Sequence, residues 1–126
     1  MALTPVKDLV ARAKTEITTL PVEEVAEGVA KGEMLLVDIR DPRELERTGR
    51  IPGAFHAPRG MLEFWIDPAS PYHKEALKTE KTLVLFCASA WRSALSVKTL
   101  QDMGAENIAE LDGGFSAWQA AGKPVD

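Results

Sequence analysis

The only cysteine of this sequence, Cys87, stands where chemistry is easily placed in an α/β protein. It directly follows the apolar run TLVLF, and a helical pattern begins about five residues later. In a parallel α/β sheet such a junction lies at the carboxyl end of a strand, where ligands bind. Unpaired N–H groups at the following helix N-terminus would stabilise a thiolate. We therefore predict that Cys87 is a nucleophile with a lowered pKa; the alternative is a small buried hydrophobic residue at a strand end.

The residues after Cys87 have the composition of an anion-binding turn. The first three are small and would let the backbone curl around a bound group. Arg92 adds a permanent positive charge with a planar donor fork; alternatively it is exposed, or it pairs with a carboxylate that braces the loop. Trp91 is predicted to be exposed at the rim, where an aromatic residue often meets a partner. The predicted binding loop consists of Ala88, Ser89, Ala90, Trp91, Arg92 and Ser93.

Strands and helices are predicted to alternate along the chain. Continuous apolar runs, typical of strands covered on both faces, occupy residues 34–39 and 82–86, with a weaker run at 107–111. Helical patterns cover residues 6–17, 21–32, 42–47, 93–103 and 115–121. This alternation predicts an α/β fold with a central, mainly parallel sheet and helices on both faces.

Residues 58–81 form the least regular stretch, and a connection of that length is usually functional or mobile. The apolar cluster at 61–66 within it is predicted to be a short amphipathic helix that caps the sheet, or else one wall of a substrate or partner cleft. His56 is predicted to be a partly buried residue at a strand end rather than a general base.

Length and composition exclude several classes of protein. The 126 residues suit one domain, and one cysteine cannot form an internal disulfide. One cysteine and two histidines cannot supply the repeated ligand pairs of a zinc ribbon, and no metal or organic cofactor is predicted. A net charge of −4 argues against a basic nucleic-acid surface. No apolar run is long enough to span a bilayer, and none resembles a signal peptide, so we expect a cytoplasmic protein without a membrane partner.

Three segments resemble single-domain rhodaneses, the thiosulfate-type sulfurtransferases. They are LLVDIRDPRELERTGRIPGAFHAP at 35–58, CASAWRS at 87–93 and ELDGGFSAWQAAGKPV at 110–125. The resemblance implies a rhodanese-like three-layer domain over residues 1–126, with residues 1–18 as a helical extension. It implies that Cys87 carries sulfur as a persulfide, cradled by the amides of residues 88–92. It also implies structural roles for Asp38, Arg40, Glu44, Gly113, Gly114 and Trp118.

Two departures from the family pattern fall in the loop: Ala90 stands where a glycine is common, and Ala88 where a basic residue is frequent. Because a Cβ penalises positive φ, Ala90 is expected to keep a negative φ if its amide points inward. The expected reaction takes a sulfane sulfur from thiosulfate or a persulfide and passes it to cyanide or a thiol. With one cysteine in the sequence, that thiol, on a small molecule or a protein, is expected to be external.

Two other function classes remain open. Cysteine phosphatases and arsenate reductases also use a Cys–Arg loop, but five residues separate the two, whereas four lie between Cys87 and Arg92. The shorter loop predicts a cradle sized for one sulfur atom. A non-catalytic binding or regulatory module on the same fold is the other alternative, although retention of both Cys87 and Arg92 argues against it.

Overall fold

A five-stranded sheet organises the molecule in the computed structural model, which describes residues 1–126. All its strand pairs are parallel, in the order β1-β5-β4-β2-β3. The strands are β1 (Thr19–Leu20), β2 (Met34–Asp38), β3 (Phe55–His56), β4 (Thr82–Phe86) and β5 (Ile108–Leu111). The predicted α/β class and parallel sheet are confirmed. The edge strand β1 was not predicted, because two residues carry no readable pattern.

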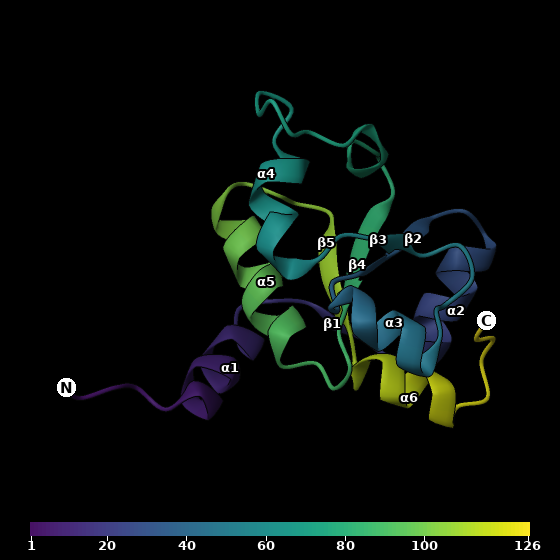
Figure 1. The fold of residues 1–126 in the computed structure, drawn as a ribbon, viewed down its shortest axis with the longest axis horizontal. Helices are drawn as coiled ribbons and strands as arrows, with labels where there is room; N and C mark the ends of the chain where they lie inside the picture. The colour runs from purple at the N-terminus through teal and green to yellow at the C-terminus, as the bar shows by residue number, and fades with distance from the viewer.

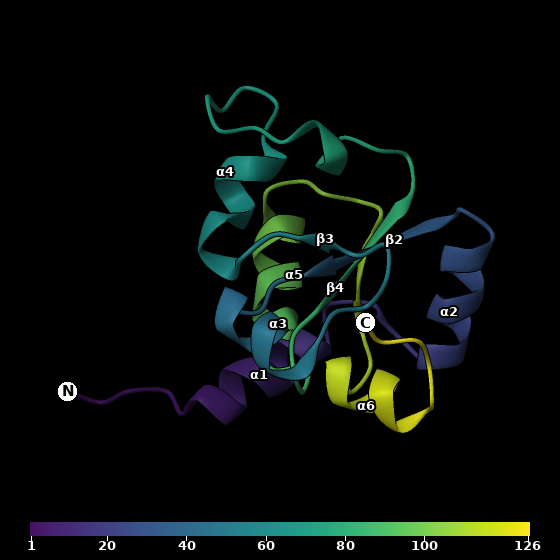
Figure 2. The ribbon, with the colours of Figure 1, turned by 45° about the vertical axis from the view of Figure 1, so that its right-hand side comes forward.

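Helices cover both faces of this sheet, as Figures 1 and 2 show. They are α1 (Val6–Lys14), α2 (Val22–Ala30), α3 (Pro42–Thr48), α4 (Leu62–Ile66), α5 (Arg92–Asp102) and α6 (Gly114–Ala120). Buried side chains place α4 and α5 on one face and α2 and α6 on the other. The first helix packs outside α5, where Val10 and Ala13 meet Ala94. It ends at Lys14, three residues earlier than its predicted limit at residue 17.

Side chains of β4 and β5 point alternately to the two faces of the sheet, and this alternation determines which residues can meet at the site. In β4, Leu83 and Leu85 pack on the α5 side, and Cys87 continues this series one residue beyond the strand. Val84 and Phe86 pack on the opposite face. Side chains two positions apart on a strand point to the same face. Cys87 follows Leu85 by two positions, so its thiol is directed toward the start of α5.

The alternation of side chains along β5 directs a charged residue to the same face of the sheet. Ile108 packs on the α5 side, and Glu110 follows it two residues later. Glu110 is paired in register with Leu85 of β4 and with Thr19 of β1. The carboxyl ends of β4 and β5 therefore bring a thiol and a carboxylate to the same side of the sheet.

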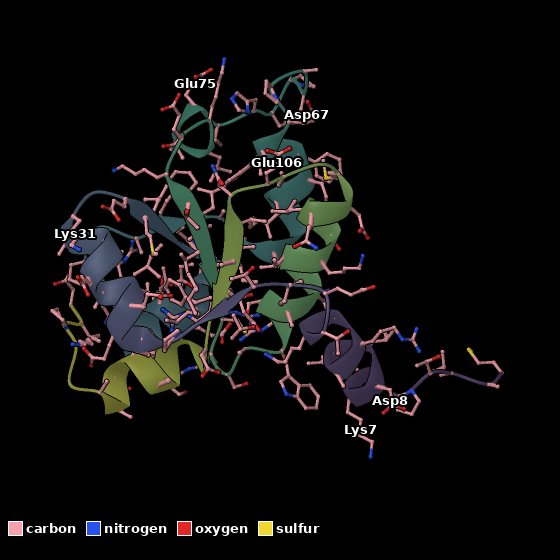
Figure 3. All side chains as sticks on the ribbon, turned by 180° about the vertical axis from the view of Figure 1, so that it is seen from behind. Lys7, Asp8, Lys31, Asp67, Glu75 and Glu106 are labelled. Carbon is pink, nitrogen blue, oxygen red and sulfur yellow. The ribbon has the colours of Figure 1, made fainter.

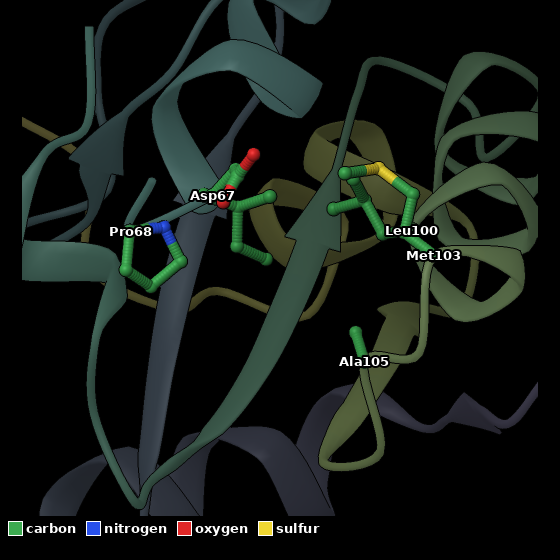
Figure 4. A pocket seen from close by; sticks show the side chains of 6 residues that line it. Asp67, Pro68, Leu100, Met103 and Ala105 are labelled. Atoms are coloured by element: carbon green, nitrogen blue, oxygen red, sulfur yellow. The ribbon is translucent and has the colours of Figure 1, made fainter. Parts of the chain in front are cut away.

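Residues 57–81, between β3 and β4, lie mostly at the end of the sheet opposite to Cys87 (Figure 1). Their apolar cluster forms α4, with Leu62 buried and Trp65 packed against the core. A hollow of about 430 Å³ lies between the ends of α4 and α5, with Asp67 and Pro68 on one side and Leu100 and Met103 on the other (Figure 4). Because α5 runs back from the carboxyl edge, this hollow is remote from Cys87. None of the helices is both long and apolar enough to cross a bilayer.

Candidate active site

Cys87 is nearly inaccessible, at 1% exposure, and lies at the start of the loop that joins β4 to α5. Burial alone raises the pKa of its thiol. Hydrogen bonds to sulfur from the amides of Ser93, Ser89 and Ala90, together with the contact between the sulfur and the Ser93 hydroxyl, outweigh burial and leave the pKa below its ordinary value. The site thus combines the burial of a core cysteine with the electrostatics of a reactive one.

Ala90 contradicts the expectation for its backbone. Its φ is +68°, the only positive φ of a residue other than glycine, and its amide nevertheless donates toward Cys87. The expected negative φ is therefore wrong. The loop closes by placing an alanine where the family commonly has glycine, and the surrounding fold sustains the cost of about 1–2 kcal/mol.

The N-terminus of α6 fixes the first peptide groups of the loop. The N–H of Phe115 donates to the carbonyl of Cys87 at 2.8 Å, and the N–H of Ser116 donates to the carbonyl of Ala88 at 3.1 Å. A Cβ on Gly114, whose φ is +62°, would come within 2.5 Å of the Cys87 carbonyl oxygen. Gly114 is thus required for the close approach in which these two carbonyls accept hydrogen bonds from the first turn of α6.

Arg92 braces the loop against α3. Its guanidinium donates to both carboxylate oxygens of Glu44, at 2.8 and 2.9 Å. The hydrogen bond from Arg92, opposed by burial and aided by the Asp41 amide, lowers the pKa of Glu44 to about 2. Of the arrangements open to Arg92, pairing with a carboxylate is therefore the one observed. Trp91 is 49% exposed beside it, as predicted for the rim.

Behind Cys87 lies a hydrogen-bonded chain that the sequence did not predict. The thiol donates to the Ser93 hydroxyl at 3.7 Å, and that hydroxyl donates to Glu110 Oε1 at 2.7 Å. The other oxygen of Glu110 accepts from Lys14 Nζ at 2.6 Å and from Thr19 Oγ1 at 2.8 Å. The available signal was a glutamate inside the apolar run of a predicted strand, since a buried charge requires a partner.

Other polar residues that the sequence singled out contact parts of the chain other than Cys87. Arg40, 1% exposed, pairs with Asp38 at 2.8 Å and stacks over the Phe115 ring at 4.1 Å. His56, at the end of β3, directs Nε2 to the Arg40 carbonyl at 2.8 Å rather than to Cys87. No group of three or more His, Cys, Asp or Glu side chains is arranged to hold a metal ion.

Similar proteins whose descriptions name an activity include both a sulfurtransferase and phosphatases. A Rhodopseudomonas palustris structure described as a possible tyrosine phosphatase is 45% identical, with a TM-score of 0.93 over 100% of this chain and 97% of that one. A sulfurtransferase of Allochromatium vinosum is 30% identical over 93 residues, which are 74% of this chain and 78% of that protein. The dual specificity phosphatase Cdc25 of Arabidopsis thaliana is 32% identical over 99 residues, 71% of this chain and 64% of that protein.

The family of the chain follows from its full pattern of elements and motifs. The model of the rhodanese-like domain matches residues 21–121, from just before α2 to just after α6. This range contains the parallel strands β2 to β5, the loop from Cys87 to Arg92 and the glycine pair that begins α6. The chain belongs to the rhodanese-like domain family.

Proposed function

We propose that the protein is a sulfurtransferase that carries a sulfane sulfur as a persulfide on Cys87. The observation that supports this most strongly is a buried thiol whose pKa is lowered by the inward amides of Ser89, Ala90 and Ser93. Donors directed at one atom beyond a strand end suit a single anionic sulfur. The predicted cradle comprises residues 88–93.

The reaction would proceed by double displacement. The Cys87 thiolate attacks the outer sulfur of thiosulfate, a new S–S bond forms, and the bond to the sulfonate sulfur breaks with its electron pair, releasing sulfite. Cyanide or an external thiolate then attacks the outer sulfur of the persulfide, and the Cys87 thiolate leaves. The 126 residues contain no second cysteine, so an acceptor from outside them completes the cycle.

Turnover with thiosulfate and cyanide tests the proposal. Wild-type protein is expected to form thiocyanate, and Cys87→Ser is expected to form none above background. Serine is close to cysteine in size, so this variant nearly keeps the volume of the site. It loses the nucleophile, because a serine hydroxyl is not ionised near neutral pH. Wild-type protein that is inactive with thiosulfate and with a small organic persulfide would leave the non-catalytic module as the better description.

A second candidate, phosphatase activity, is favoured by two of the similar proteins, whose descriptions name phosphatases. Against it stands the loop, in which four residues separate Cys87 from Arg92 and Arg92 already gives both arms of its fork to Glu44. A phosphoryl group would need that fork for its own oxygens. Hydrolysis of p-nitrophenyl phosphate that disappears in Cys87→Ser would reverse this preference.

A further inference from the structure

The buried carboxylate behind the site is held by the helix that precedes the family range. Glu110 has no exposed side-chain surface, whereas Lys14, which pairs with it, is 35% exposed. Lys14 comes from α1 and Thr19 from β1, both before residue 21, where the family match begins. A buried carboxylate without a partner is costly, so these two residues make a charged Glu110 tolerable beside the loop.

The Ser93 hydroxyl connects that carboxylate to the sulfur. It has one proton, which it donates to Glu110 at 2.7 Å, and it accepts from the Cys87 thiol at 3.7 Å. While the proton is directed to Glu110, the hydroxyl cannot also donate it to a thiolate. The strength with which Glu110 attracts this proton therefore affects the balance between thiol and thiolate at Cys87.

We propose that Lys14 is a positioning residue for Cys87: it compensates the charge of Glu110 and thereby limits how strongly that carboxylate opposes a negative charge on the sulfur. The inference rests on the proposed function, in which Cys87 is the reacting residue. The hydrogen bond and the ion pair of Lys14 are both made with Glu110 and not with the sulfur or the loop amides. Lys14 acts through Glu110 and Ser93.

Arg92 is the other charged group that acts on Cys87, since it attracts a negative charge on the sulfur in addition to its pairing with Glu44. Arg92 of α5 is paired with Glu44 of α3, and Arg40, just after β2, is paired with Asp38. The first turn of α6 contains no ionisable side chain. Of the charged groups around the site, Lys14 and Glu110 thus form the pair linked to the sulfur through the Ser93 hydroxyl.

Two substitutions that each remove one charge should move the pH midpoint of Cys87 ionisation in opposite directions. In Lys14→Met, Glu110 keeps the donors Thr19 and Ser93 but loses its countercharge, so a thiolate must form near an uncompensated anion. We expect the midpoint to rise by about one pH unit. In Glu110→Gln the anion is removed, Lys14 remains, and the Ser93 proton is released toward sulfur. We expect the midpoint to fall by about one pH unit.

The measurement is the rate of alkylation by iodoacetamide as a function of pH, which reports Cys87 alone because the sequence has one cysteine. Lys14→Arg should restore the wild-type midpoint. Lys7→Met is the matched control, since Lys7 lies on the same helix and is exposed, with its side chain pointing into solvent in Figure 3. It should leave the midpoint unchanged.

Midpoints that stay at the wild-type value in both variants, or that move in the same direction, would overturn the proposal. If Lys14→Met does not fold, the near-isosteric Glu110→Gln decides alone, and an unchanged or raised midpoint contradicts the role. Alkylation does not require sulfur transfer. Opposed shifts in a protein that takes sulfur from neither thiosulfate nor a small organic persulfide would therefore refute sulfur transfer and leave the effect of Lys14 on the thiol standing.

Discussion

Ala90 shows how much backbone strain the active loop tolerates in one residue. Its φ of +68° is relieved by glycine, but the substitution also removes a buried methyl group and loosens the unfolded chain. These effects oppose each other, so we expect Ala90→Gly to change the free energy of unfolding by no more than about 0.5 kcal/mol.

The matched control is Ala94, an equally buried alanine in the regular helix α5. There glycine brings no relief, and Ala94→Gly should cost about 2 kcal/mol. Urea unfolding of both variants checks the comparison. Equal losses at the two positions would show that Ala90 is not strained in solution.

The ion pair between Glu44 and Arg92 makes stability depend on acid pH. The pKa of Glu44 is about 2 in the folded protein, against an ordinary value of 4.5. Because the folded value is the lower one, the pair contributes its full stability above about pH 4.5 and loses it as the pH falls toward 2.

Glu44→Gln tests this pH dependence. With allowance for solvent screening at a partly exposed pair, the substitution should cost about 1–2 kcal/mol at pH 7. It should cost almost nothing near pH 2, where the wild-type carboxyl is itself becoming neutral. Urea unfolding of both proteins across this range provides the measurement, and a difference that stays constant with pH would contradict the assignment.

At the scale of elements, the contact between α6 and the active loop depends on Gly114. A side chain there would meet the carbonyls of Cys87 and Ala88 at a φ of +62°. We expect Gly114→Ala to lose about 3 kcal/mol of stability and to slow sulfur loading at least about tenfold, because the loop must shift.

Gly122 provides the control for strain alone. Its φ is +74°, but a Cβ at this position meets no atom within 4 Å. Gly122→Ala should therefore cost only about 1 kcal/mol and leave sulfur loading intact. If both variants load sulfur at the wild-type rate, the contact with α6 does not position the loop.

The elements that could be predicted from the sequence are those with a long hydrophobic pattern. The apolar runs of β2 and β4 and the periodicity of α5 indicated the sheet and the helix that flank Cys87. Strand β1 could not be predicted, because its existence depends on pairing with β5 rather than on its own two residues. Ala90 could not be predicted either, since the local preference against positive φ is overruled by tertiary contacts.

At the scale of the whole molecule, the candidate site is assembled from distant parts of the chain. Cys87 and its loop are contiguous and could be found by reading along the sequence. Lys14 and Glu110 are separated by 96 positions, and Arg92 and Glu44 by 48. Such pairs become visible only when the strand order brings β1, β5 and β4 together and places α3 beside the start of α5.

This assembly holds Cys87 from several directions. The sheet directs its side chain toward α5, α6 fixes the loop carbonyls, and Glu44 anchors Arg92. The donors that remain to act on the sulfur are the loop amides, and the Arg92 guanidinium adds an attractive charge. An arrangement of this kind stabilises a small anion at one position, which is what a persulfide requires.

The mass of the intact protein after incubation with thiosulfate tests this central claim most directly. We expect the wild-type protein to gain the mass of one sulfur atom and to lose it again on addition of cyanide. The Cys87→Ser variant, treated in the same way, should gain nothing. A wild-type protein whose mass is unchanged by thiosulfate and by a small organic persulfide, or a variant that gains the same mass, would contradict a persulfide on Cys87.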